Sequence, residues 1–117
     1  DPKYNVDMFI GIGGGPEGVI AASALDAYDC HFQGRFIFDN DQDINEAKKM
    51  GVIDLDKKYE LNEIVKGDSI FCATAITSSN ILNGIKIKGK NYISETLVTH
   101  KSSGFKKIIK KTNIIKE

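Results

Sequence analysis

The sequence predicts an α/β fold, with a mostly parallel sheet and flanking helices followed by antiparallel β-hairpin strands. Two observations lead to this prediction. Up to Thr74, short apolar runs alternate with segments whose apolar residues recur at helical spacing, which favours strand–helix–strand crossovers and a parallel sheet. Within residues 85–109, apolar and polar residues instead alternate with a period of two between turns, which is typical of antiparallel strands with one wet face.

The first predicted strand and helix surround a glycine-rich segment. Residues 7–12 are an apolar run that predicts a short buried strand, and residues 16–28 predict a helix. The apolar residues at helical spacing are Val19, Ile20, Ala24 and Ala27. Pro16 suits a first helical position, where its missing N–H costs nothing. Residues 11–18 therefore lie at a strand-to-helix junction.

The alternation continues through the middle of the chain. It predicts strands at residues 34–38 and 69–74, a helix at residues 43–50 and a short helix at residues 60–66. The polar residues 77–80 follow the last of these strands. Ligands bind at the carboxyl ends of strands in open α/β sheets, but we interpret this segment as a turn or helix cap.

The last third of the chain predicts a hairpin. Residues 85–88 and 92–98 flank Gly89-Lys90-Asn91, which is typical of a short turn between antiparallel strands. Ser102-Ser103-Gly104 predicts a second turn, which leads into a strand at residues 105–109.

Length and composition are those of one globular domain covering residues 1–117. The chain is 41% hydrophobic and 27% charged, and no repeat, linker or low-complexity tract divides it. It has no apolar run of roughly 18 residues that could span a bilayer, and no recognisable signal peptide. We therefore expect a cytoplasmic protein with no membrane partner.

Charge excludes a general affinity for nucleic acid. Lys plus Arg and Asp plus Glu both number 16, so the net charge is zero. Lysines gather in the last third, notably at Lys106, Lys107, Lys110 and Lys111. We interpret them as a solvated face or a strand edge guarded against aggregation, with a nucleic-acid-binding arm as the minor alternative.

Cysteine and histidine give no metal motif. Cys30 is predicted to end a helix and Cys72 to lie in an apolar strand, so both are expected to be reduced, buried thiols. His31 and His100 lack the spacing of metal ligands and are interpreted as structural or surface residues.

The glycine-rich junction is the candidate functional site. Glycine can adopt positive φ and lets a ligand approach the backbone, and the start of the following helix attracts anions. Glu17 lies in the first helical turn, where a carboxylate can simply complement the helix dipole. Alternatively, because a carboxylate repels a phosphate unless a cation lies between them, Glu17 could be a ligand of Mg²⁺ or Mn²⁺ beside a bound phosphate.

A dinucleotide site is the competing interpretation. Gly13, Gly15 and Gly18 match the Gly-x-Gly-x-x-Gly fingerprint, and Asp39 follows the next predicted strand at about the distance, roughly 20 residues, that this motif requires. The fingerprint alone is weak evidence, and Asp39 also fits a polar turn that caps a helix.

Several motifs resemble the carboxyl-terminal part of the class II fructose-1,6-bisphosphatases, the GlpX-type enzymes. The most specific is Gly11-Ile12-Gly13-Gly14-Gly15-Pro16-Glu17-Gly18-Val19, followed by Gln33-Gly34-Arg35. Further similar segments, in the same order, are Ala47-Lys48-Lys49-Met50-Gly51, Val65-Lys66-Gly67-Asp68, Phe71-Cys72-Ala73-Thr74-Ala75-Ile76-Thr77 and Leu82-Asn83-Gly84-Ile85. The resemblance covers residues 5–109, and departs from the family at Gly15, usually Thr or Ala, and at Thr99-His100, usually a hydrophobic residue and Arg.

The resemblance implies a fold of the lithium-sensitive sugar-phosphatase type. It also implies gluconeogenic, metal-dependent hydrolysis of the 1-phosphate of fructose 1,6-bisphosphate, with sedoheptulose 1,7-bisphosphate as a second substrate. By resemblance Glu17 is a metal ligand, for Mn²⁺ or Mg²⁺, and Gly14 binds substrate through its backbone, while Gly13 and Gly15 shape the same turn.

The resemblance also implies that the site is incomplete in this chain. The family's other metal carboxylates and its catalytic residues belong upstream of the matched region, so no catalytic residue is expected here. We expect the 117-residue chain alone to be inactive, to expose apolar surface, and to belong to a homo-oligomer. Besides the dinucleotide-binding domain, a noncatalytic dimerising module remains an alternative.

Overall fold

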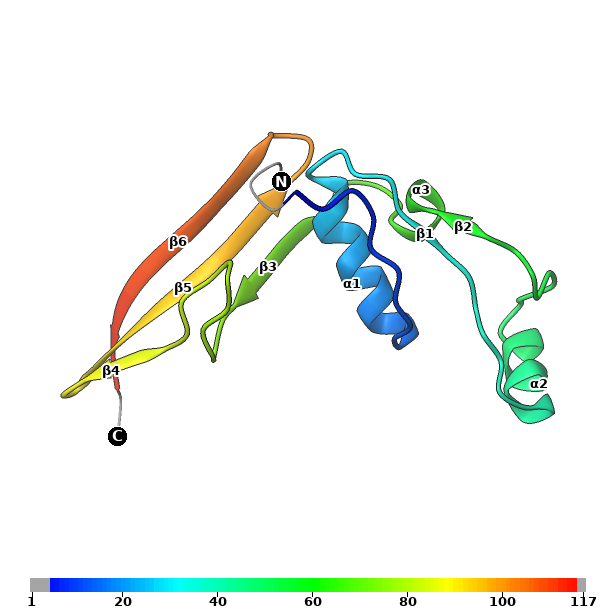
Figure 1. Cartoon of the computed structure of the whole chain (residues 1–117), viewed down its shortest axis with the longest axis horizontal. Coiled ribbons are helices and arrows are strands. Elements are labelled where there is room, and N and C mark those ends of the chain that lie inside the picture. The colour runs from blue at the N-terminus through cyan, green and yellow to red at the C-terminus, as the bar shows by residue number, and fades with distance from the viewer. Residues whose placement is uncertain (1–4, 116–117) are drawn as a thin grey trace.

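The computed structural model describes residues 5–115 (Figure 1). The helices are α1 (Gly15–Asp26), α2 (Asp41–Lys49) and α3 (Leu61–Ile64). The strands are β1 (Gln33–Gly34), β2 (Tyr59–Glu60), β3 (Ile70–Thr74), β4 (Lys86–Lys88), β5 (Asn91–His100) and β6 (Phe105–Ile114). They form a small β1–β2 ladder and a four-stranded sheet, so the α/β class is confirmed.

The four-stranded sheet is built around β5. One edge of β5 pairs with β3 and β4, and β6 pairs along its other edge. The predicted hairpin is confirmed, because Gly89 and Lys90 alone separate the paired residues Lys88 and Asn91. The second turn is confirmed as well, with Phe105 paired to His100. Gly89 and Gly104 both take positive φ, 59° and 64°, which explains the glycines in these turns.

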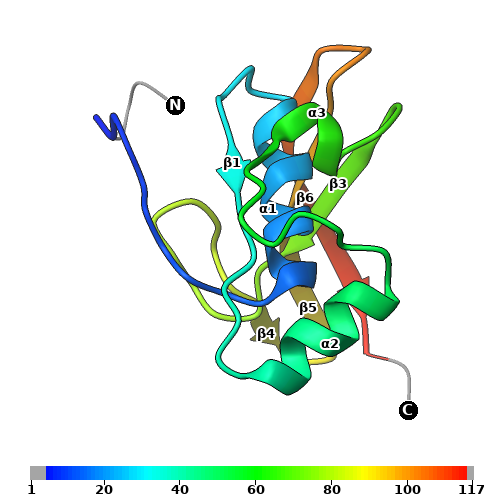
Figure 2. The ribbon, with the colours of Figure 1, turned by 90° about the vertical axis from the view of Figure 1, so that its right-hand side faces the viewer.

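Helix α1 packs against β3, on one side of this sheet. Alternate residues of a strand lie on opposite faces, and the paired residues Phe71 and Thr99 lie on the same face. Thr99 is only 1% exposed and Ala22 of α1 is fully buried, which places the small core under α1. Figure 2 shows α1 in front of β5 and β6. The predicted helix is thus confirmed, although Val19 and Ile20 remain about half exposed.

Helices α2 and α3 both begin at local hydrogen-bonded caps. The side chain of Asn40 accepts a hydrogen bond from Asp43 N at 2.9 Å, which begins α2. Acidic residues in its first turn and two lysines in its last turn match the helix dipole. Glu60 and Glu63 form a reciprocal capping box at α3. The helices predicted at 43–50 and 60–66 are confirmed with shifted ends.

Two predicted strands are absent or shortened. Residues 7–12 are extended but pair with no strand, and of the predicted strand at 34–38 only Gly34 lies in a ladder. All strand pairs within residues 5–115 are antiparallel, so the predicted parallel sheet does not form there. The physical reason is that a strand exists only beside a hydrogen-bonded neighbour, and the apolar pattern of a segment does not supply that neighbour.

The molecule is extended and poorly buried. Its dimensions are 54 × 35 × 27 Å and its radius of gyration is 18.0 Å, against about 13 Å for a compact chain of this length. Its accessible surface is 9443 Å², where about 6300 Å² is usual for this mass. Among the described residues, no helix is long and apolar enough to cross a membrane.

Candidate functional site

The glycine-rich segment ends in an uncapped helix start. Gly14 is the N-cap residue of α1, with extended backbone and no side chain to bond the first N–H groups. Gly18 N donates to Gly14 O at 3.0 Å, and Pro16 has no N–H. The N–H groups of Gly15 and Glu17 therefore have no partner within the helix and are available to an anion.

Among the glycines from Gly13 to Gly18, Gly14 alone would bring a Cβ close to another side chain. A Cβ at Gly14 would collide with the carboxylate of Glu17, which folds back over the turn, whereas at Gly13, Gly15 and Gly18 a Cβ would meet nothing. Glycine can adopt positive φ, but no glycine of residues 11–18 does so in the structure; the glycines with positive φ lie elsewhere in the chain. Close approach, rather than unusual backbone, distinguishes Gly14.

Glu17 lies where a metal ligand could act, but it belongs to no cluster of three or more metal-ligating side chains within residues 5–115. Its side chain is exposed at the start of α1. Within residues 5–115 there is no group of three or more His, Cys, Asp or Glu side chains that could hold a metal ion. Divalent cations such as Mg²⁺ are bound through one or two carboxylates together with substrate phosphate oxygens and water. Glu17 thus fits such a site as one contributor.

The dinucleotide interpretation loses its structural basis. The fingerprint requires parallel strands on either side of the glycine turn and its helix. Residues 7–12 are unpaired, and Gln33 and Gly34 pair antiparallel with β2. Asp39 is exposed just ahead of the α2 N-cap, Asn40. The described residues therefore form no strand–helix–strand unit around the turn.

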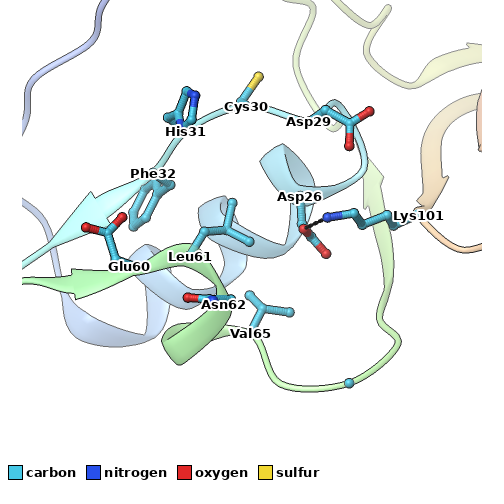
Figure 3. Close-up of a pocket in the computed structure, with 11 residues that line it drawn as sticks. Asp26, Asp29, Cys30, His31, Phe32, Glu60, Leu61, Asn62, Val65 and Lys101 are labelled. Carbon is cyan, nitrogen blue, oxygen red and sulfur yellow. Dashed lines mark hydrogen bonds and ion pairs between the residues drawn. The ribbon is translucent and has the colours of Figure 1, made fainter.

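A cavity of about 580 Å³ lies at the opposite end of α1 (Figure 3). Asp26, at the carboxyl end of α1, accepts a hydrogen bond from Lys101 Nζ at 2.6 Å on one side of this cavity. That bond, together with the charge of Asp26, raises the pKa of Lys101. The contact ties α1 to the β5–β6 turn. Neither Glu17 nor a glycine of the turn lines the cavity.

A second polar cluster, which we call the hairpin clamp, joins Asp68, His100, Ser102 and Ser103. Asp68 Oδ2 lies 2.7 Å from His100 Nε2 and accepts from Ser102 Oγ at 2.8 Å, while His100 Nδ1 lies 2.8 Å from Ser103 Oγ. Two hydrogen bonds lower the pKa of Asp68: the one from His100 has the larger effect and the one from Ser102 the smaller. The structural role predicted for His100 agrees with this geometry. Its partner Asp68 lies 32 residues away, and no local sequence pattern marks such a pair.

Other sequence predictions meet mixed outcomes. The cap in residues 77–80 is present: Ser79 Oγ accepts from Leu82 N at 3.2 Å, and Ser78 Oγ accepts from Gly84 N at 2.9 Å. Both cysteines are free thiols. The prediction that they are buried is wrong for Cys72, which is exposed, and Cys30 is only half-buried. Cys72 is exposed because its strand is covered on one face only.

The lysine-rich strand is solvated as predicted. The side chains of Lys106, Lys107, Lys110 and Lys111 are all exposed on β6. The outer edge of β6 carries no partner strand within residues 5–115. This arrangement is that of a charged edge strand.

Comparison with known proteins places this sequence in one family. A family described as "Bacterial fructose-1,6-bisphosphatase, glpX-encoded" matches residues 1–113. Proteins named D-fructose 1,6-bisphosphatase class 2/sedoheptulose 1,7-bisphosphatase are similar: one from Synechococcus sp. (strain JA-2-3B'a(2-13)) is 35% identical over 84% of this chain and 32% of its own length. One from Trichormus variabilis is 32% identical over 85% of this chain and 32% of its own length.

The chain spans about a third of the length of the curated relatives it matches. The match nevertheless runs through the glycine-rich turn, α1 and the four-stranded sheet except for Ile114, the last residue of β6. The chain therefore belongs to the glpX-encoded bacterial fructose-1,6-bisphosphatase family.

Proposed function

We propose that this chain supplies one part of the active site of a metal-dependent phosphatase that hydrolyses the 1-phosphate of fructose 1,6-bisphosphate, with sedoheptulose 1,7-bisphosphate as a second substrate. The observation that carries the proposal is the position of Glu17 over Gly14 at an uncapped helix start. One carboxylate and two free N–H groups lie together there, and this combination suits a phosphate with a divalent cation beside it.

In this proposal each group of the turn has a separate task. The N–H groups of Gly15 and Glu17 bind phosphate oxygens, while Gly13 and Gly14 let the substrate approach the backbone. The Glu17 carboxylate holds Mn²⁺ or Mg²⁺. When bound, such an ion polarises the phosphoryl group and lowers the pKa of a bound water. The absence of a Cβ at Gly14 leaves room for Glu17 to fold over the phosphate position.

The remaining catalytic groups come, in this proposal, from the two thirds of the relatives' length that this chain does not span. A single carboxylate holds Mg²⁺ poorly, so the chain alone is inactive. In the longer protein, residues 7–12 and 34–38 gain strand neighbours and join a parallel sheet of the lithium-sensitive phosphatase type. Residues 1–117 then act as one domain of a cytoplasmic homo-oligomer.

The test is phosphate release from fructose 1,6-bisphosphate with Mn²⁺, measured on the longest natural chain that contains this segment, the parent chain. Glu17→Gln is expected to lower kcat/KM by about 100-fold or more, because a direct metal ligand matters at least as much as its supporting groups. The matched control is Asp41→Asn, which also removes a carboxylate from a first helical turn. If both variants keep full activity, Glu17 only complements the helix dipole and the proposal fails.

Gly14 gives an independent test of the same site. Gly14→Ala is expected to displace the Glu17 carboxylate and to weaken Mn²⁺ dependence in the parent chain. Gly18→Ala serves as the control for adding a methyl group, because that Cβ meets nothing within 4 Å. Equal loss of activity in the two variants would contradict the specific role of Gly14.

A further inference from the structure

The face of the four-stranded sheet opposite Thr99 carries exposed apolar side chains among polar ones. We call it the open face. Strand pairing places on it Ile70, Cys72, Ile87, Val98 and Ile109, together with polar residues such as Thr74, Thr96, Lys107 and Lys111. Ile70 is 67% exposed, Ile87 69% and Ile109 46%. In Figure 1 the helices lie to the right of this sheet, beyond β3.

The sequence of the strands indicates that the open face is covered in the working protein. An antiparallel sheet with one face in water carries polar residues on that face. In β3, however, Ile70, Phe71, Cys72 and Ala73 are all apolar, a continuous run typical of strands buried on both faces. The excess of accessible surface over that of a compact chain, about 3000 Å², is in the range of large, obligate interfaces.

A second copy of this chain is a poor occupant. No sheet residue on the open face is Asp or Glu, whereas Lys107 and Lys111 both lie on it, opposite Val98 and Ser94. Two open faces packed together would bring lysines into one interface with no carboxylate from either copy to meet them. The occupant must therefore present an apolar centre with acidic groups beside β6.

We infer that the open face is the docking surface for the upstream two thirds of the same enzyme, the part of the relatives' length that this chain does not span. The inference rests on the proposed function, because it takes the chain to be part of that longer protein. The inference adds the place of contact, which is the open face of β3, β5 and β6. It also adds the chemistry of the upstream surface that packs there: an apolar centre, with carboxylates that meet Lys107 and Lys111.

Cys72 provides a native probe of this contact. Its thiol is exposed on the open face in this chain and would be buried in the proposed interface. We expect a maleimide to label Cys72 readily in the isolated chain and only after unfolding in the parent chain. Glu17→Gln, which lies outside the open face, should abolish phosphatase activity without changing this labelling, so failure of the proposed function and failure of the docking surface can be told apart.

Substitutions at two exposed positions of the open face extend the test to binding. The upstream polypeptide of the parent chain, added separately, is expected to co-elute with this chain. Ile70→Lys or Ile109→Lys should each weaken that association by about 30-fold or more, as for a central interface residue. Ile53→Lys is the control, because Ile53 is 94% exposed and lies outside the sheet.

Three results would overturn the inference. The first is labelling of Cys72 in the native parent chain at the rate seen in the isolated chain. The second is equal association by the Ile53 and Ile70 variants. The third is concentration-dependent protection of Cys72 in this chain alone, which would assign the open face to a second copy.

Discussion

Thr99 shows how a single buried atom can oppose the stability of the sheet. Its side chain is 1% exposed, and its hydroxyl oxygen has no hydrogen-bond partner among the described residues. Burying an unpaired hydroxyl costs about 1–3 kcal/mol. The similar residue Thr96 differs, because its hydroxyl lies 2.8 Å from that of Thr74.

Thr99→Val is expected to stabilise the chain by about 1 kcal/mol, because it replaces the unpaired hydroxyl with a methyl group of similar size. Urea unfolding measures the effect. Thr96→Val is the control and should be neutral or destabilising, since it removes a hydroxyl that has a partner. A Thr99 variant less stable than the original chain would show that its hydroxyl is paired in solution.

At the residue scale, sequence predicted where the candidate site lies but not its geometry. The spacing of glycines, proline and Glu17 predicted an anion-binding helix start, and α1 begins there. The close approach of the Glu17 carboxylate to Gly14 depends on the rotamer of Glu17, which no pattern encodes. The contact between His100 and Asp68 likewise depends on the β3–β5 register.

At the scale of elements, the hairpin clamp joins the start of β3 to the turn between β5 and β6. Asp68 lies just before β3, whereas His100, Ser102 and Ser103 lie at the β5–β6 turn. Because hydrogen bonds to its charged form lower the pKa of Asp68, folding favours the carboxylate. The resulting stabilisation is fully present above the unfolded pKa, about 4, and is lost as pH falls through the lower folded pKa.

Asp68→Asn should therefore flatten the fall in melting temperature on acidification below about pH 4. The effect should be small, because the Asp68 side chain is 54% exposed and solvent screens its contacts. Thermal unfolding followed from pH 6 to pH 2 is the measurement, with Asp56→Asn as the control at an exposed carboxylate. Identical pH profiles for the original chain and the Asp68 variant would contradict the role of the clamp.

The lysines of β6 prevent that strand from pairing with its own copy. In a twofold antiparallel pair, opposite residues lie on the same face, so their numbers have an even sum. A pair centred on Ile109 brings Lys107 opposite Lys111, and a pair centred on Ile108 brings Lys106 opposite Lys110. Like charges directly opposite are destabilising, so each central register is disfavoured.

Replacing Lys107 and Lys111 together by Thr should raise the weight-average mass of the chain in sedimentation velocity, because the register centred on Ile109 loses its repulsion. Lys48→Thr with Lys49→Thr makes the same change of charge on the α2 surface and should leave the mass unchanged. A mass that does not rise in the β6 variant would show that charge does not protect this edge.

Local elements were predicted well because their signals are local. The caps of α2 and α3 and the glycines of the two hairpin turns act over a few residues, and all of these elements form. The strands predicted at 7–12 and 34–38 failed because pairing is a property of two segments. Their apolar residues predicted burial, which was wrong for residues 7–12 in this chain, because the described residues contain nothing that buries them.

The whole molecule is a sheet with helices on one side and an apolar extended segment beside it. Phe9, Ile10 and Ile12 are each at least 85% exposed, which is unusual for large apolar side chains in a stable fold. Only four apolar residues are buried among those described: Ala22, Ala27, Ala47 and Leu82. Composition predicted a globular domain, but composition does not reveal whether the surfaces that close a core belong to the same segment.

Amide hydrogen exchange tests this view of the molecule. In the isolated chain, amides of residues 7–12 should exchange at nearly unstructured rates, because no backbone partner protects them. In the parent chain the same amides should be slowed by orders of magnitude, while those of β5 are protected in both. Rapid exchange of residues 7–12 in the parent chain would show that this segment stays unpaired.

The β4–β5–β6 meander also bears on the order in which the chain folds. A two-residue and a four-residue connection join its strands, so little loop-closure entropy is lost when they meet. The contact of Lys101 with Asp26 spans 75 residues and must wait for a much longer loop to close. We therefore expect the meander to form before β3 and α1 pack against it.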